Sequence, residues 1–315
     1  MANALQTTQQ KSIAAERPKF SAFMNKDNIK NLVQQAVGKN AQRFTASIMS
    51  AVSNNPDLQK CEQATILSGA LLGESLGLSP SPQLGQYYLV PFAKKDRQGN
   101  VTCYNAQFVL GAKGYKQLAM RSGQYLDIDV LEIKEGEYKG RDKLTGKQKF
   151  EFIEDDDERE SRPTIGYMAY FEMLNGFRKT VYWTKSKMVR HADTYSPAFN
   201  AEKYDDYING KIPQKELYKY SSYWYKNFTE MAFKTLIRHL LSQWGVLSIE
   251  MQIAIERDNA VILENGEPSY VEYEEIATPP ETTESADTEH ENSDTAGAST
   301  DEQDFDFFQG SKKKK

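Results

Sequence analysis

Cysteine and histidine are scarce in this sequence, which has two cysteines and three histidines among its 315 residues. Cys61 and Cys103 have no C-x-x-C partner and lie among apolar neighbours, so the sequence predicts two reduced thiols and no disulfide framework. The histidines are far apart, and none has a second ligand at the spacing of a metal site. We therefore expect neither a metal ion nor another bound cofactor.

Long apolar segments are missing as well. No segment reaches the roughly twenty apolar residues that cross a bilayer, and the N-terminal region has no apolar run of signal-peptide length. The sequence therefore predicts a soluble protein inside the cell, without membrane contact.

The motifs of the common nucleotide-hydrolysing and ester-hydrolysing enzymes are absent. The segment nearest to the phosphate-binding loop G-x-x-x-x-G-K-[ST] is 140–148, where five residues separate the glycines and Gln148 stands in place of the metal-binding hydroxyl. No G-x-S-x-G nucleophile elbow occurs. These absences lead us to expect a binding protein and not an enzyme.

Charge is distributed unevenly along the chain. Residues 264–315 hold 15 acidic residues and only four lysines, a net charge of −11; the whole chain carries −5, so residues 1–263 carry +6. The first twenty residues lack apolar periodicity, and the acidic segment is too polar to fold alone. The composition predicts a disordered N-terminus over 1–20, a folded core over 21–263 and a disordered acidic tail over 264–315.

The acidic tail ends in the sequence EQDFDFF before its terminal lysines. This tip resembles the acidic, aromatic tip by which bacterial single-strand-binding proteins recruit partners. Three roles stay open for the tail: a strand mimic that competes for a basic surface, a docking peptide, or only a solubilising segment.

Apolar spacing of i, i+3 and i+4 predicts helices at the start of the core, and strand-like alternation follows. The predicted helices are 29–37, 41–53 and 62–76, and the predicted strands are 84–93, 101–110 and 126–133, with a short basic helix before the last strand. A hairpin comes next, with strands 164–174 and 177–183 joined by a type I′ turn at Asn175-Gly176, so that Glu172 would face Lys179.

The second half of the core is predicted to be mainly helical. Thr184 caps a helix, and residues 192–222 then form a long loop rich in tyrosine. The last long helix is 223–244, and an amphipathic segment at 249–262 closes the core.

The segment 75–124 combines aromatic residues with cations and holds no group able to break a bond. Lys113, Lys116 and Gln117 share a face of the short helix, and no carboxylate lies three or four residues away to neutralise them. Trp224 stands between two tyrosines, and three consecutive rings cannot all point inward from a helix start. Cations neutralise phosphates and rings stack on bases, so the pattern favours single-stranded nucleic acid, although a basic helix face can also be merely solvated.

Three segments carry a resemblance to a known family. LGLSPSPQLGQYYLVPF, FVLGAKGYKQLAMRSGQ and, at 231–240, MAFKTLIRHL resemble the core of the RecT family of phage and prophage single-strand DNA annealing proteins. The matched cations are Lys113, Lys116, Arg121, Lys234 and Arg238, whereas His239 and Gly245 depart from the family's pattern near the helix end.

The resemblance implies an α+β fold with N-terminal helices, a curved antiparallel β-sheet and crossing helices. It also implies binding of single-stranded DNA and of the annealed duplex intermediate, together with ATP-independent annealing of complementary strands in phage-type recombination. A homo-oligomer in the form of a ring or helical filament is implied as well. The implied partners are a phage 5′-to-3′ exonuclease and the host single-strand-binding protein, in the cytoplasm of a bacterial host cell.

The residue patterns and the resemblance together give a set of candidate DNA-binding residues, which come from the β-rich segment, the basic helices and the aromatic cluster. They are Lys94, Lys95, Arg97, Lys113, Tyr115, Lys116, Arg121, Lys185, Lys187, Arg190, Trp224, Lys226, Lys234 and Arg238.

Two other functions stay open. A passive single-strand-binding protein would bind equally well but would cover the bases and inhibit pairing. The best enzyme alternative is a metal-dependent nuclease, built on Asp127, Asp129, Glu132 and Lys134. Strand alternation argues against it, because the first two side chains project to one face and the last two to the other unless a bulge intervenes. A charged strand with Leu126 and its alternate neighbours facing the core explains the same sequence.

Overall fold

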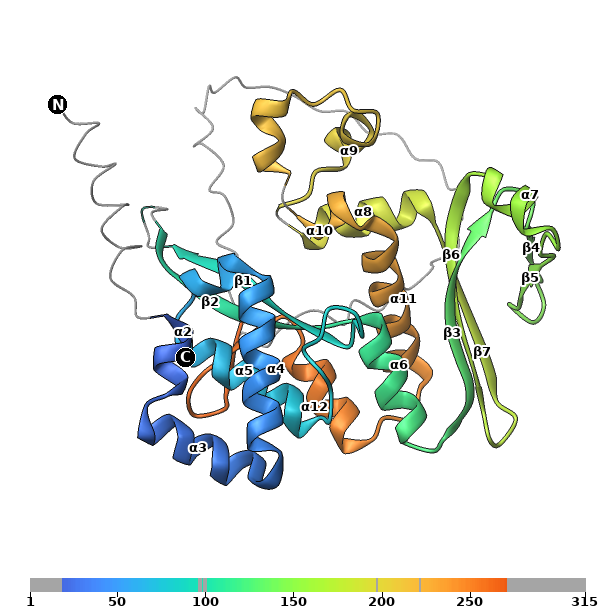
Figure 1. Cartoon of the computed structure of the whole chain (residues 1–315). Coiled ribbons are helices and arrows are strands. Elements are labelled where there is room, and N and C mark those ends of the chain that lie inside the picture. Colours follow the sequence, from blue (N-terminus) through green and yellow to red (C-terminus); the bar gives the residue numbers. More distant parts are fainter. Residues whose placement is uncertain (1–18, 96–97, 99–100, 197, 221, 271–315) are drawn as a thin grey trace, which may run out of the picture. The chain divides into compact units, whose positions relative to one another are not determined.

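The computed structural model describes residues 19–95, 98, 101–196, 198–220 and 222–270, all within the first of two compact units, Met1–Tyr273. The fold is α+β, with helices and antiparallel sheets, as the sequence predicts (Figure 1). The division of the chain into a core and two disordered ends stays a prediction.

Helices open the described chain, because apolar residues recur there at helical spacing. They are α2 (Phe20–Met24), α3 (Asp27–Val37), α4 (Ala41–Asn54) and α5 (Gln63–Ser75), with 3-10 turns at Gly38–Asn40 and Pro56–Lys60. The chain leaves α3 at Gly38 with a φ of 60°, a left-handed conformation that glycine adopts at low cost. α5 is buried on most sides, which is typical of a helix in a core.

α5 packs on a four-stranded antiparallel sheet of order β1-β2-β8-β9. Its strands are β1 (Tyr87–Lys95), β2 (Val101–Leu110), β8 (Ala260–Ile262) and β9 (Pro268–Ser269). Tyr87, Leu89 and Phe108 are buried on this sheet. Gly69 and Gly73 let the helix approach, since an added Cβ would lie 2.8 Å from Leu89 and 2.3 Å from the Tyr87 ring.

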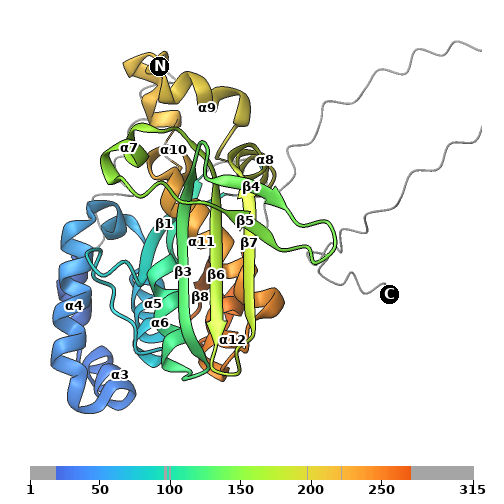
Figure 2. The ribbon, with the colours of Figure 1, turned by 90° about the vertical axis from the view of Figure 1, so that its right-hand side faces the viewer.

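A three-stranded antiparallel sheet of order β3-β6-β7 forms the other part of the core. Its strands are β3 (Tyr125–Lys134), β6 (Thr164–Met173) and β7 (Arg178–Thr184). The long helix α11 (Phe228–Trp244) packs on all three strands and on α6 (Ala112–Arg121). Figure 2 shows these helices behind the sheet, while β4 (Tyr138–Arg141), β5 (Gln148–Phe150) and α7 (Asp156–Ser161) cross one end of its other face.

Strand β3 does not alternate from its first residue as the sequence predicts. The pairing of β3 with β6 shifts between Tyr125 and Asp127, which is a bulge. Leu126 therefore exposes 58% of its surface, while Tyr125 and Ile128 are buried. The expectation that Leu126 faces the core is wrong, because the bulge changes the face to which it points.

The hairpin of β6 and β7 forms, but its predicted register is wrong. Glu172 faces Arg178, whose guanidinium donates to the Glu172 carboxylate at 2.7 Å. Lys179 faces Phe171 instead. The favourable cross-strand ion pair exists, with a different cation.

The turn of this hairpin explains the register. A type I′ turn requires positive φ at both Asn175 and Gly176, and only Gly176 has it, at 82°. The Gly176 N–H donates to the Met173 carbonyl, and the Met173 N–H donates to the carbonyl of Phe177, both at 2.9 Å. The loop therefore contains three residues, a type I turn followed by glycine, and the strand after it is shifted by one position.

The chain between β7 and α11 contains more helix than the sequence predicts. α8 (Lys185–Tyr195) begins as predicted, since the Thr184 side chain accepts the N–H of Lys187 at 3.2 Å. α9 (Ala201–Ile208), a 3-10 turn (Gln214–Lys219) and α10 (Tyr223–Lys226) follow. The predicted helix 223–244 is interrupted at Asn227, which has a φ of −141° and a ψ of 59°, so α10 and α11 are separate.

The predicted closing segment 249–262 divides into α12 (Ile249–Arg257) and β8, with Asn259 at a φ of 64° between them. β8 pairs with β2, and β9 pairs with β8. β9 lies beyond the predicted core boundary at residue 263, so the fold continues at least to Ser269.

Candidate nucleic-acid interface

The outward face of β1 carries the first of the candidate side chains. Side chains alternate along a strand, so Tyr87 and Leu89 are buried against α5 while Tyr88 and Lys94 point to the other face. Tyr88 exposes 37% of its surface, and Lys94 is exposed. This face offers a ring and a cation to a ligand.

The start of α6 lies against the loop that precedes β1, because two glycines remove the side chains that would separate them. A Cβ added at Gly111 would lie 2.2 Å from the carbonyl oxygen of Gly85, and one added at Gly114 would lie 2.1 Å from that of Gln86. The Gly111 N–H donates to the Gln86 carbonyl at 2.9 Å. Lys113, between the two glycines, remains exposed.

The Tyr88 side chain lies beside the start of α6. A Cβ added at Gly85 would lie 3.0 Å from the Tyr88 hydroxyl and 3.3 Å from Cδ of Lys113, so these two side chains share one side of the loop. Burial raises the pKa of Tyr88, and the nearby charges of Glu230 and Tyr223 raise it further. The Tyr88 ring and the Lys113 side chain, from two segments distant in sequence, therefore lie on the same side of this loop.

We call Tyr88, Lys94, Lys113, Tyr223 and Lys226 the exposed group. Tyr223 exposes 46% of its surface and Lys226 is also exposed. Among the described residues, none of the group's three lysines takes part in an ion pair. Unpaired cations beside exposed rings are suited to phosphates and to stacked bases.

Two candidate cations of α11 point into the core, toward Asp258. Nζ of Lys234 lies 2.9 Å from the Asp258 carboxylate, and Nη1 of Arg238 lies 3.4 Å from it. The same carboxylate accepts the Tyr115 hydroxyl at 2.9 Å and the Leu110 N–H at 2.8 Å. We call this set the Asp258 centre.

The Asp258 centre is buried. Lys234 exposes 7% of its surface and Asp258 exposes 3%, while the side chain of Arg238 keeps 28% exposed. Burial lowers the pKa of Lys234, and the charge of Asp258 opposes that shift. A DNA contact from Lys234 stays a prediction, and it would have to break the enclosed pair with Asp258.

Two predicted aromatic contacts are also enclosed. Tyr115 has no exposed surface, since its hydroxyl donates to Asp258. Trp224 exposes 6%, and its ring packs on those of Phe199 and Phe228, with centroids 6.2 and 5.3 Å away. Neither ring offers a free face in this structure, so a base contact from Tyr115 or Trp224 stays a prediction that would require the ring to leave its packing. The break at Asn227 directs Trp224 inward and leaves Tyr223 outside.

Lys116 and Arg121 on α6 are bonded within the protein. Nζ of Lys116 lies 2.6 Å from the Asp129 carboxylate, a partner from β3 that helical spacing could not reveal. The Arg121 guanidinium donates to the carbonyl oxygens of Leu76 and Gly77 at the end of α5. A cation is favourable at that position because the last carbonyls of a helix lack partners. A DNA contact from either side chain stays a prediction, and each would compete with these bonds.

The cations of α8 lie on a helix that covers one end of β6 and β7. Lys185 is half-buried and Arg190 is exposed, while Nζ of Lys187 lies over the Trp183 ring, 4.6 Å from its centroid. Their part in DNA binding stays a prediction. Arg97 and the side chain of Lys95 lie outside the described residues.

His191 on α8 is a further titratable group in this region. Its ring centroid lies 5.3 Å from that of Trp183 and 4.6 Å from that of Tyr195. Burial lowers the pKa of His191 to about 4, and the charges of His239, Lys187 and Arg238 lower it as well. His191 is thus neutral at physiological pH.

The four residues of the nuclease alternative do not converge. Asp127 accepts the hydroxyl of Tyr170, whereas Asp129 pairs with the lysine of α6. Glu132 accepts the hydroxyl of Thr229 at 2.7 Å and Nζ of Lys134 at 3.1 Å. Burial opposes ionisation of Glu132, but these hydrogen bonds outweigh it and lower the pKa of the carboxyl.

The described residues contain no group of three His, Cys, Asp or Glu side chains that could hold a metal ion. Cys61 is buried and Cys103 is half-buried, and the two are not joined in a disulfide. In the same part of the chain, no helix is long and apolar enough to cross a membrane.

The residue that sequence reasoning missed is Asp258. It lies in the segment RDN between α12 and β8 and carries no motif. An indirect signal exists, because two cations in one helix that is otherwise apolar require a buried counter-charge. The sequence does not indicate which carboxylate supplies it.

Comparison with known proteins places the chain in a family. The family model described as RecT family matches residues 42–276, most of the chain. "Uncharacterized protein YqaK" of Bacillus subtilis (strain 168) is 37% identical to this chain over 222 residues. These residues are 70% of this chain and 66% of that protein, so the match covers slightly less than two thirds of the relative's length. "Protein RecT" of Escherichia coli (strain K12) is 26% identical over 245 residues, 75% of this chain and 79% of that protein.

A fold of helices and antiparallel sheets with a surface of unpaired cations and rings defines a candidate nucleic-acid-binding protein. The chain belongs to the RecT family.

Proposed function

We propose that this protein binds single-stranded DNA and anneals complementary strands in homologous recombination, without hydrolysing a nucleotide. Membership of the RecT family supports the general activity. The observation that carries the proposal is the exposed group, in which Lys113 and Tyr88 lie on one side of Gly85 while Tyr223 and Lys226 are exposed on α10.

The mechanism requires no bond-breaking side chain. Lysines of the exposed group neutralise phosphates of one strand, and Tyr88 and Tyr223 offer faces on which bases stack. A strand held in this way repels a second strand less, because part of its charge is compensated. Base pairing then supplies the specificity and the driving force.

Further contacts extend this interface. Lys185, Lys187 and Arg190 of α8 are proposed as additional phosphate ligands, together with Lys95 and Arg97. We also propose a homo-oligomer, a ring or a helical filament, in the cytoplasm of a bacterial host cell. A phage 5′-to-3′ exonuclease would supply single strands, and the host single-strand-binding protein would be the other partner.

An annealing assay without ATP tests the activity. Two complementary oligonucleotides carry a donor and an acceptor dye, so that pairing is read as energy transfer. The proposal predicts faster pairing with the protein than without it. The alternative of a passive single-strand coat predicts slower pairing at the same occupancy, and that result would overturn the proposal.

A double substitution tests the interface. Lys113→Gln with Lys226→Gln should weaken binding to all sequences about equally and reduce the salt slope of binding by about one to two ions. The matched control is Lys211→Gln with Lys215→Gln, which removes the same charge from exposed positions near α9. If both double variants bind like the wild-type protein, the exposed group is only a solvated surface.

A further inference from the structure

The ribbon formed by β4 and β5 lies outside the exposed group, yet it is strongly basic. A single carboxylate, that of Asp142, accompanies five cations between Tyr138 and Phe150. The cations are Lys139, Arg141, Lys143, Lys147 and Lys149, and all five are exposed. Figure 2 shows the ribbon crossing β7 and extending past the edge of the sheet.

The rings of the ribbon face the protein and fix it in place. The Tyr138 ring stacks on that of Tyr182 in β7, with centroids 4.4 Å apart, and Phe150 meets Tyr182 edge-on at 5.8 Å. Gly166 in β6 makes room for the Tyr182 ring, since an added Cβ would lie 2.5 Å from it. With the rings turned inward, the outward face carries cations without a stacking platform.

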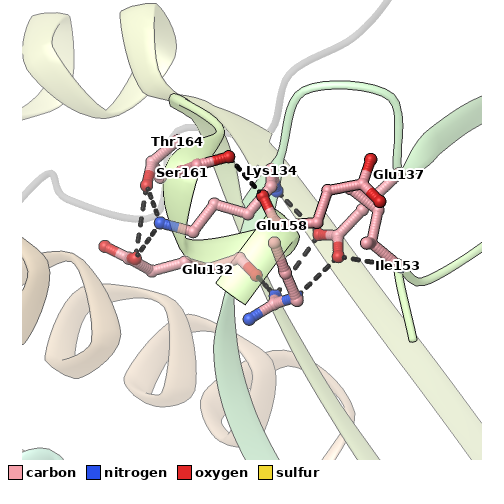
Figure 3. A network of polar contacts seen from close by, with 8 residues as sticks. Glu132, Lys134, Glu137, Ile153, Glu158, Ser161 and Thr164 are labelled. Carbon is pink, nitrogen blue, oxygen red and sulfur yellow. Dashed lines mark hydrogen bonds and ion pairs between the residues drawn. The ribbon is translucent and has the colours of Figure 1, made fainter. Parts of the chain in front are cut away.

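The root of the ribbon is anchored by Glu137, which has no exposed surface (Figure 3). Its carboxylate accepts Nε of Arg159 at 2.6 Å and the Lys134 N–H at 2.7 Å. Arg159 also donates to the backbone carbonyl of Glu132 at 2.7 Å. Burial would raise the pKa of Glu137, but these bonds outweigh burial and lower it. The carboxylate therefore stays ionised, and α7 is tied to β3.

The tip of the ribbon presents Leu144, which exposes 95% of its surface. The Asp142 carboxylate holds the turn, because it accepts the N–H of Leu144 at 3.1 Å and the N–H and hydroxyl of Thr145 at 2.8 and 2.9 Å. An apolar side chain held in water by a preformed turn contributes nothing to the core. The Leu144 side chain is therefore free to contact a ligand.

We propose that the β4–β5 ribbon is an arm that binds the backbone of duplex DNA, with Leu144 at its leading end. The inference deepens the proposed function, because the duplex is the product of annealing. A two-stranded β-ribbon is of a size that a DNA groove admits, and apolar side chains on DNA-binding proteins can insert between base steps. Single strands are instead bound by stacking of their bases on aromatic rings. The rings of this ribbon pack against β7 and are not available for such stacking.

A preformed duplex of random sequence, with blunt ends, is the probe for the test. Lys143→Gln with Lys147→Gln removes two cations beside the tip that have no ion pair among the described residues. This variant should bind the duplex more weakly and with a salt slope lower by about two ions. Binding to an unpaired oligonucleotide should stay within about twofold, and Lys211→Gln with Lys215→Gln should change neither.

Leu144→Ser provides a second variant at an exposed position, where folding is not at risk. It removes no charge, so the salt slope should stay unchanged while duplex affinity falls by roughly tenfold, the scale of burying a leucine side chain. Unchanged duplex affinity in both variants would overturn the proposal. The proposal would also be overturned if the wild-type protein bound and annealed single strands but failed to bind duplex. That result would leave the proposed function intact.

A second copy of the chain is the competing occupant, because α7 at the root of the ribbon carries several exposed carboxylates. Sedimentation of the full chain without DNA separates the two cases. The proposal predicts the same oligomeric state for the wild-type protein and for both variants. A smaller assembly in the variants would assign the ribbon to contacts between copies and overturn it.

Discussion

The exposed group and the Asp258 centre contain the same kinds of side chain in opposite surroundings. In the exposed group, Lys113 and Lys226 are in water and have no ion pair with any described residue. In the Asp258 centre, Lys234 is enclosed, 2.9 Å from a carboxylate. The sequence predicts a helix that carries cations at each of these three lysines, so it does not distinguish the exposed ones from the buried one.

The difference shows that the role of a cation depends on whether the fold brings a carboxylate to it. Asp258 lies 24 residues from Lys234 in sequence and reaches it only because β8 returns to β2. A cation with such a partner contributes to folding, since breaking a buried pair leaves an uncompensated charge. A cation without one keeps its charge available for a phosphate.

The largest expected effect comes from removing the buried carboxylate. Asp258→Ala leaves Lys234 and Arg238 close together without their counter-charge and should lower the free energy of unfolding by about 3 to 5 kcal/mol. Denaturant unfolding followed by circular dichroism measures the loss. Asp205→Ala removes an exposed carboxylate of α9 and should change stability by no more than about 0.5 kcal/mol.

A double substitution then sharpens the comparison. Asp258→Asn with Lys234→Met removes both charges, so the pair should lose less stability than the sum of the two single changes. Strict additivity would show that the two groups do not interact in the folded protein. The description of a coupled centre would then be wrong.

A smaller effect is expected from His191, a half-buried basic group among cations. Its pKa is lowered to about 4 in the folded protein, against 6.5 in a free side chain. Between these values the unfolded chain binds the proton and the folded one does not, so stability falls as the pH falls. The expected loss from pH 7 to pH 5 is about 1 to 2 kcal/mol, allowing for partial exposure.

Unfolding of His191→Gln at the same two pH values provides the control, since this variant should lose most of that pH dependence. The carboxylates with lowered pKa, such as Glu137, lose their contribution only below this window. NMR titration of the His191 ring gives a direct measurement. A pKa near 6.5 would contradict the assignment.

The smallest expected effect separates two lysines of one helix. Lys113 is exposed and unpaired in the described structure, whereas Lys116 already has the Asp129 carboxylate at 2.6 Å. Lys113→Gln should therefore reduce the salt slope of single-strand binding by about one ion, and Lys116→Gln by less than that. Equal slopes would show that the pair with Asp129 opens when DNA binds.

Local patterns predicted most of the elements. Helical spacing gave α3, α4 and α5, alternation gave the long strands, and Thr184 caps α8 as expected. These features depend on residues within one or two turns of each other. The sequence contains that information directly.

Features that depend on one backbone angle or on a distant residue could not be predicted. The hairpin register follows from the negative φ of Asn175, and its sequence Asn-Gly suits both kinds of turn. Trp224 turned out to be buried because the helix is interrupted at Asn227, a residue that is compatible with a continuous helix. The partner of Lys116 comes from another strand, and spacing along the helix cannot show it.

The order in which the chain is made gives the position of Asp258 a further significance. Its carboxylate accepts the N–H of Leu110, 148 residues earlier, and the β8 strand that follows pairs with β2. Contacts between residues so far apart form late, since a long loop must close before they contribute. During synthesis, α11 is complete at Trp244 while the carboxylate that neutralises its inward cations has yet to be added. A nascent chain that stops between these two points carries a finished helix that it cannot bury.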